Sequence, residues 1–158
     1  MANLFLASEI LEVSISEEIN GAAFYAAVAE SAQNEILKKT AAELSEQEKN
    51  HATRFYGLQE ELKKTEPSTL YTRGRDEYLN WIVKSKIFTD SDTAEILAHS
   101  KSDRETIQFA LKVEEASLTL LRELETHVDE DGRHVVQLTI EEEEQHVQLL
   151  TDLMKKIQ

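Results

Sequence analysis

The sequence predicts an all-α fold, a bundle of four long helices arranged as two antiparallel hairpins that a long, partly helical crossover joins. The 158 residues include only one proline and four glycines, the two residue types that most disfavour helix interiors. Apolar residues recur at three- and four-residue spacing along four long stretches, which is the pattern of a buried helix face. The second half of the chain also repeats a polar pattern of the first. At this length, one domain over residues 1–158 is expected.

The first predicted helix covers about residues 8–33. Glu18 lies in phase with its apolar face, which consists of Leu11, Ile15, Ala22, Tyr25 and Ala29. Asn34 follows and favours a helix N-cap after a tight turn. The next helix, over about residues 35–63, should therefore return antiparallel to the first.

The apolar face of this second helix includes two polar residues. Glu48 and His51 occupy positions in phase with the apolar residues Leu37, Ala41, Leu44, Phe55, Leu58 and Leu62. A glutamate of the solvent-facing side would fall out of phase with this series. The pattern therefore places both polar side chains in the core.

A crossover is predicted over about residues 64–101. It begins near Pro67, the only proline, which cannot continue a helix. Helical pieces are expected near residues 75–88 and 92–99. A helix of about 29 residues is roughly 44 Å long, and a connection of this length can carry the chain back along it. The helices on either side of the crossover are then expected to run parallel.

The second hairpin begins with the motif Ser-Asp-Arg-Glu at residues 102–105, a capping-box signature. The helix that follows, over about residues 103–127, has Glu114 in phase with Ile107, Leu111, Leu118 and Leu121. After a turn at residues 127–132, the last helix covers about residues 133–157. Its inward face combines Glu143 and His146 with Val136, Ile140, Val147, Leu150 and Met154.

The two hairpins carry the same polar motif. A glutamate and a histidine three residues apart share one helix face, and this E-x-x-H pair occurs twice. Each copy follows another core-phase glutamate, at a distance of 30 residues in the first hairpin and 29 in the second. A single E-x-x-H in so acidic a chain is usually solvent-facing, but two matched copies in the core predict a dinuclear metal site. Its predicted ligands are Glu18, Glu48, His51, Glu114, Glu143 and His146.

These residue types suit two iron ions per chain, with zinc or manganese as alternative occupants. Four carboxylates balance the charge of two Fe(II) ions and can bridge them, while each imidazole binds one ion. Without metal, four carboxylates in an apolar interior repel one another, so some of them should be protonated.

Other polar residues near the motifs are not expected to bind metal. Three glutamates adjoin predicted ligands but lie off the core phase: Glu17, Glu115 and Glu144. Three histidines lie outside the repeat and are expected at the surface: His99, His127 and His134. Tyr25 is interpreted as a core residue rather than a redox-active one.

Composition excludes several classes of protein. The chain has no cysteine, which excludes a disulfide framework, a zinc ribbon and a built-in rubredoxin-type iron site, and suits a cytoplasmic location. A net charge of −14 argues against nucleic-acid and anionic-membrane partners. Residues 1–6 lack the features of a signal peptide, and no stretch has the roughly 20 apolar residues of a membrane span.

The chain resembles the ferritin-like, rubrerythrin-related family over nearly its whole length. The resemblance rests on Glu18-x-x-Gly21-x-x-Phe24-Tyr25, Glu48-Lys49-Asn50-His51-Ala52-x-Arg54-Phe55, Glu114-x-x-Ser117 and Glu143-x-x-His146. It implies a ferritin-like four-helix bundle with a non-haem di-iron centre that reacts with hydrogen peroxide or dioxygen. It also implies a homodimer or larger assembly, an external electron donor such as a rubredoxin, and a role in oxidative stress.

Two departures from the family bear on activity. Rubrerythrins carry a C-terminal rubredoxin domain, and this sequence has no cysteines to form one. The family also places a further glutamate one turn after the ligand on the third helix, where this chain has Ser117. That carboxylate belongs to the iron movement associated with peroxide reduction, so Ser117 favours a more generic di-iron protein.

The function predicted is therefore that of an oxidoreductase that oxidises Fe(II) with hydrogen peroxide or dioxygen. One alternative is a non-enzymatic module that stores, delivers or senses iron, zinc or manganese. Another is a bundle whose carboxylates no longer bind metal.

Overall fold

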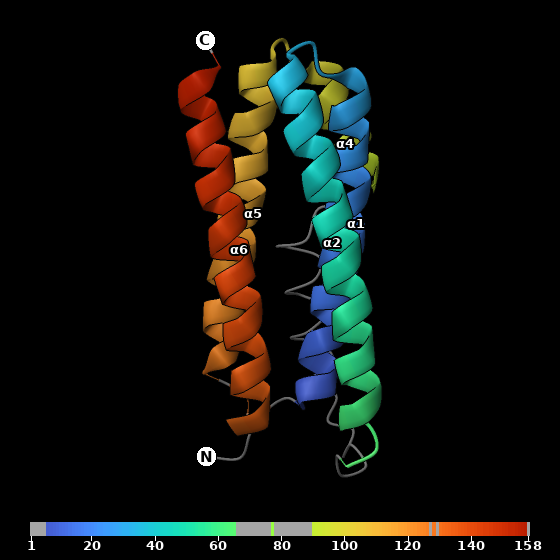
Figure 1. Ribbon diagram of the computed structural model, residues 1–158. Helices are drawn as coiled ribbons and strands as arrows, with labels where there is room; N and C mark the ends of the chain where they lie inside the picture. The colour runs from blue at the N-terminus through green and yellow to red at the C-terminus, as the bar shows by residue number, and fades with distance from the viewer. Residues whose placement is uncertain (1–5, 66–76, 78–89, 127, 129, 158) are drawn as a thin grey trace.

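In the computed structural model, residues 6–65, 77, 90–126, 128 and 130–157 are described. The fold is all-α, as predicted, and its helices are α1 (Ala7–Ser31), α2 (Glu35–Leu62), α4 (Asp90–His99), α5 (Asp103–Glu125) and α6 (Glu130–Lys156). Helix α1 packs along α2 and α5 packs along α6, which gives the two antiparallel hairpins of a ferritin-like four-helix bundle (Figure 1). None of the helices described is both long and apolar enough to cross a membrane.

The turn between α1 and α2 is fixed from both sides. The side-chain oxygen of Asn34 accepts hydrogen bonds from the backbone nitrogens of Ile36 (2.9 Å) and Leu37 (3.2 Å), so Asn34 is the N-cap of α2 as predicted. Asp103, at the start of α5, accepts a hydrogen bond from the backbone nitrogen of Gln33 at 3.1 Å. The turn of the first hairpin is thereby joined to the start of the second.

The direction of the helices agrees with a long crossover. Helix α2 ends at the bottom of Figure 1 and α5 begins at the top, so the two run parallel. Within the crossover, α4 covers the piece expected at residues 92–99 and packs against α1. The piece expected at residues 75–88 and the break at Pro67 lie outside the described residues.

Two local details of the second hairpin differ from expectation. The Ser102 side chain caps α5 by accepting a hydrogen bond from the backbone nitrogen of Glu105 (3.2 Å). A capping box would have the Glu105 carboxylate accept from the backbone nitrogen of Ser102, but it accepts from the backbone nitrogen of Lys101 instead (2.7 Å). Helix α6 begins at Glu130 instead of about residue 133. Glu130 and Asp131 stabilise this earlier start because acidic side chains favour the positive end of the helix dipole.

Apolar clusters lie on both sides of the predicted polar positions. Along α2, Leu44 belongs to one buried cluster and Phe55 to another, with Glu48 and His51 between them. Along α6, Glu143 lies between Val136 and Leu150 in the same way. The bundle therefore contains a polar layer between apolar layers, and burying ionised groups there costs several kcal/mol for each unpaired ion.

Candidate metal centre

All six residues predicted as metal ligands meet between the two hairpins. Their donor atoms form three overlapping groups in which every atom lies within 4.8 Å of the others. The groups are Glu48, His51 and His146; Glu114, Glu143 and His146; and Glu18, Glu48 and Glu143. Five of the six residues are 2–4% exposed, and only the His51 side chain, at 15%, is partly accessible.

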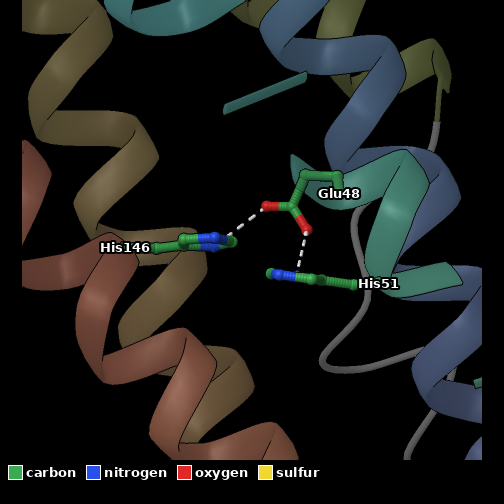
Figure 2. A group of neighbouring side chains, drawn as sticks. All are labelled: Glu48, His51 and His146. Carbon is green, nitrogen blue, oxygen red and sulfur yellow. Dashed lines mark ion pairs between the residues drawn. The ribbon is translucent and has the colours of Figure 1, made fainter. Parts of the chain in front are cut away.

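Glu48 lies between the two histidines and directs one oxygen toward each (Figure 2). Its Oε1 is 3.1 Å from Nδ1 of His146, and its Oε2 is 3.8 Å from Nδ1 of His51. The two imidazole rings stack with centroids 5.2 Å apart and planes inclined by 14°. A carboxylate in this position can bridge two cations, one beside each histidine.

Each histidine also faces the upstream glutamate of its own hairpin. Oε2 of Glu18 is 3.4 Å from Nδ1 of His51, and Oε1 of Glu114 is 3.7 Å from Nδ1 of His146. The matched spacing of the sequence repeat thus places each upstream glutamate beside the histidine of its own hairpin. Each hairpin contributes one Glu and one E-x-x-H pair to the shared centre.

The unsatisfied polar atoms test whether this cluster suits cations. Glu18 Oε2, His51 Nδ1 and His146 Nδ1 are buried and have no hydrogen-bond partner in the part of the chain that the structure describes. Buried polar atoms normally have partners. Carboxylate oxygens and imidazole nitrogens are donors for first-row divalent metals, so the residues present fit a di-metal site.

Burial also perturbs the carboxylates. It raises the pKa of Glu48 to about 8 and the pKa of Glu18 to about 9, against an ordinary value of 4.5. The pKa of Glu143 is likewise raised well above its usual range, first by burial and then by the nearby Glu114 charge. Without cations, several of these groups hold their protons at neutral pH, as the sequence predicted for a crowded acidic core.

Tyr25 has a closer connection to the site than its assignment as a core residue implied. It is buried, and its hydroxyl donates a hydrogen bond to Oε1 of Glu114 across the two hairpins. Burial raises its pKa well above the ordinary value, so the phenol keeps its proton. Tyr25 therefore fixes the orientation of Glu114.

Gly21 allows α1 to approach the centre closely. A Cβ atom at this position would lie 3.3 Å from Cδ and 3.4 Å from Oε1 of Glu48. The contact with Cδ is tighter than most real Cβ contacts, so a larger residue would require the carboxylate between the histidines to shift by a few tenths of an ångström.

Glu17, which sequence reasoning set aside, lies at the edge of the centre. The Ser117 hydroxyl donates a hydrogen bond to Oε2 of Glu17 at 3.2 Å. Burial raises the pKa of Glu17 to about 8, and its charge acts on Glu48. A carboxylate from α1 thus lies beside Ser117, the position at which this chain departs from its apparent relatives.

Glu142 is a second neighbour that the sequence did not identify. Its Oε1 lies 3.9 Å from Nε2 of His51 and forms an ion pair with Arg54. The only signal was its place beside Glu143, which it shares with Glu144.

The remaining polar residues lie largely where the sequence put them. Glu115, Glu144, His99 and His134 are exposed, and His127 lies outside the described residues.

Comparison with known proteins assigns the chain to a family. A family model described as Rubrerythrin matches residues 9–100, which are 92 of the 158 residues. No curated protein and no solved structure is similar enough to the chain to count as a match. The family model includes Glu18, Glu48 and His51 and ends before Glu114, so the second half of the centre rests on the internal repeat and on the contacts above. Because the model spans more than half of the chain, the chain belongs to the rubrerythrin family.

Proposed function

We propose that this protein is a di-iron oxidoreductase in which Fe(II) is oxidised by hydrogen peroxide or dioxygen. The observation that carries the proposal is the position of Glu48, which directs one oxygen toward the buried imidazole of His146 and the other toward the partly accessible imidazole of His51. The family assignment supports it, since rubrerythrins are typically peroxidase-type di-iron proteins. Repeated turnover would require an external electron donor such as a rubredoxin.

The geometry supports a division of labour among the six residues. Glu18 and His51 would hold one cation, and Glu114 and His146 the other. Glu48, Glu143 and His146 each belong to two of the three donor groups. Because a carboxylate has two oxygens for two cations, this favours Glu48 and Glu143 as bridges. An iron pair held there would supply two electrons to an oxidant, one from each Fe(II).

The surrounding residues control protons and water. The carboxylates with raised pKa values would release their protons when cations bind to them. Tyr25 holds Glu114, and the apolar clusters on either side limit the entry of water. His51 is the most accessible of the six residues, so small oxidants should approach from its side.

Iron stoichiometry tests this proposal. Protein titrated with Fe(II) without oxygen should bind two ions per chain and develop near-ultraviolet absorption on oxidation. One iron per chain would contradict a dinuclear centre. Full retention of metal by the double variant His51→Ala, His146→Ala would contradict it as well.

A non-enzymatic module for storing, delivering or sensing metal is the second candidate. Ser117 favours it, because a neutral hydroxyl stands where the family has a carboxylate that takes part in peroxide reduction. Steady peroxide consumption with an added electron donor would identify the enzyme. Tight binding of iron, zinc or manganese without turnover would identify the module.

We also propose that two copies of the chain associate through the outer face of α1 and α2. A groove there is lined by small residues such as Ala23 and Ala26, and the apolar side chains of Ile19 and Tyr56 are 56% and 58% exposed. Among the described residues, its only charged lining residues are Lys49 and Glu60, which have opposite signs, so this face adds little to the repulsion between two chains of net charge −14.

Sedimentation velocity tests this association. Ile19→Asp should shift a dimer to the monomer, whereas Ile36→Asp, at an exposed α2 position outside the groove, should not. A monomeric parent at all concentrations would contradict the interface.

A further inference from the structure

His51 presents its two ring nitrogens to different surroundings. Nδ1 faces Glu18 and Glu48 inside the centre, at 3.4 and 3.8 Å. Nε2 faces Glu142 of α6, whose Oε1 is 3.9 Å away. The same oxygen of Glu142 is held by the Arg54 guanidinium, one helical turn after His51 on α2.

We propose that Glu142 is a positioning residue for His51, a role that rests on the proposed metal function. The Glu142 carboxylate is the hydrogen-bond acceptor for the Nε2–H group of the imidazole, which leaves the lone pair of Nδ1 directed at the centre. Histidines that bind metal through one nitrogen generally donate the other N–H to a carboxylate, carbonyl or water. The present separation is within about 1 Å of a hydrogen bond.

The surroundings of Glu142 favour this role over a simple surface ion pair. Its side chain is only 15% exposed, and its Oε2 is buried without a hydrogen-bond partner among the described residues. A surface ion pair contributes about 0–1 kcal/mol, whereas placing a further carboxylate beside an acidic core is unfavourable. An imidazole N–H that needs an acceptor gives this carboxylate a function.

The internal repeat shows that the arrangement belongs to one histidine. The residue that corresponds to Glu142 in the first hairpin is Gln47, and the residue that corresponds to Arg54 in the second is Leu149. The ion-pair contacts of His146 with Glu48 and Glu114 are both made through Nδ1, at 3.1 and 3.7 Å. The two cation positions should therefore differ in how firmly their histidine is held.

The matched control lies on the same helix. Glu144, two residues after Glu142, pairs with Arg122 at 2.8 Å, and both side chains are more than half exposed. Glu142→Leu and Glu144→Leu each remove one charge and one arginine ion pair from α6, but only Glu142 faces a histidine of the centre. Circular dichroism would confirm that both variants fold, and Arg54→Leu, which frees Glu142, gives an independent variant.

Binding of Co(II), measured in competition with a chelator, is the first readout. Glu142→Leu should weaken one of the two binding steps by roughly 10–100-fold and leave the other unchanged. Arg54→Leu should act in the same direction but more weakly, and Glu144→Leu should change neither step. Equal affinities in Glu142→Leu and the parent would overturn the inference, as would equal weakening of both steps by the Glu142 and Glu144 variants.

Imidazole nitrogen NMR of the metal-free protein is the second readout and does not depend on bound metal. In the parent, neutral His51 should carry its proton on Nε2. Glu142→Leu should lose this preference, and Glu142→Gln, which keeps one acceptor oxygen, should recover most of it. An unchanged His51 proton in Glu142→Leu would overturn the inference, even if a metal ion were lost, because Glu142 would then be a ligand itself. A parent that binds no metal pair would refute the proposed function, whereas the position of the His51 proton tests Glu142 separately.

Discussion

Glu48 is the residue at which the two halves of the centre meet. It is 3% exposed, and burial raises its pKa to about 8. Glu48→Leu should leave the metal-free bundle as stable as the parent or more stable, by up to about 1–4 kcal/mol, because it replaces a buried ionisable group with apolar volume. The variant should also gain less stability from Fe(II), since a ligand stabilises a protein only as far as it binds the native state. Thermal unfolding without oxygen, with and without iron, measures both effects, and equal iron-induced shifts in Tm would remove Glu48 from the ligand set.

Gly21 determines how closely α1 can approach this carboxylate. In Gly21→Ala the new methyl group would meet Glu48 at 3.3 Å, so the carboxylate must shift by a few tenths of an ångström. We expect weaker binding of the metal pair, by roughly tenfold if the shift costs about 1.4 kcal/mol, although alanine favours helix by up to about 1 kcal/mol.

Gly57→Ala is the matched control for Gly21→Ala. Gly57 lies in α2 with nothing within 4 Å of its would-be Cβ, so it gains the same helix propensity without touching the centre. Chelator competition should therefore separate the two variants. If both bind metal like the parent, the close approach of Gly21 has no part in the site.

Ser117 does more than replace a metal ligand of the family, because its hydroxyl donates a hydrogen bond to Glu17. Ser117→Glu would remove that donor and place a new carboxylate against Glu17, so the metal-free protein should be destabilised, by about 1–3 kcal/mol if Glu17 loses its partner. With iron bound, the new carboxylate should act as a seventh ligand and raise the ratio of peroxide to dioxygen reaction rates. Ser117→Gln, of similar size but uncharged, is the control.

Stopped-flow oxidation of the iron-loaded parent, Ser117→Glu and Ser117→Gln by peroxide and by dioxygen measures this ratio of rates. The parent should lack a strong preference for peroxide. A parent that already prefers peroxide, together with no change in Ser117→Glu, would show that Glu17 or another group already fills this role.

At the scale of the helices, the periodicity of the apolar residues was sufficient to predict most of the fold and of the candidate site. Glu18, Glu48, Glu114 and Glu143 could be placed in the core because each is in register with the apolar residues of its own helix. The bundle fold followed from the same phase and from the spacing of the repeat. The turn at Asn34 could be predicted because a cap is a local interaction.

Contacts between helices were outside the reach of that reasoning. Glu142 faces His51 and Arg54 between the two hairpins, and the partners of its ion pair are separated by 88 positions in the sequence. Glu17 meets Ser117 at a separation of 100 residues. Helical phase treats each helix alone, so a residue at the edge of an apolar face is assigned to solvent even when a neighbouring helix covers it.

At the scale of the whole molecule, the centre should make stability depend on pH in an unusual direction. Native pKa values of about 8 for Glu17 and Glu48 and about 9 for Glu18 exceed the ordinary value of 4.5. Between about pH 4.5 and 9 the native state therefore binds more protons than the unfolded state, so the free energy of unfolding falls as pH rises. The contribution of these groups is fully present below about pH 4.5 and is lost as pH rises through 8–9. Exposed carboxylates are already ionised at pH 6, so they add little to this trend.

Cations should offset this trend, because each ion that binds displaces protons from the same carboxylates and binds more tightly as pH rises. We therefore expect the Tm of the chelator-treated protein to decline steadily from pH 6 to pH 9.5, while the metal-loaded protein holds its Tm over the same range.

The double variant Glu18→Gln, Glu48→Gln keeps the shape of both side chains but cannot titrate at either position, so its metal-free Tm should vary less with pH. A metal-free parent whose Tm stays flat or rises between pH 6 and 9 would mean that the buried carboxylates are already ionised. Their protons would then not be what the cations replace.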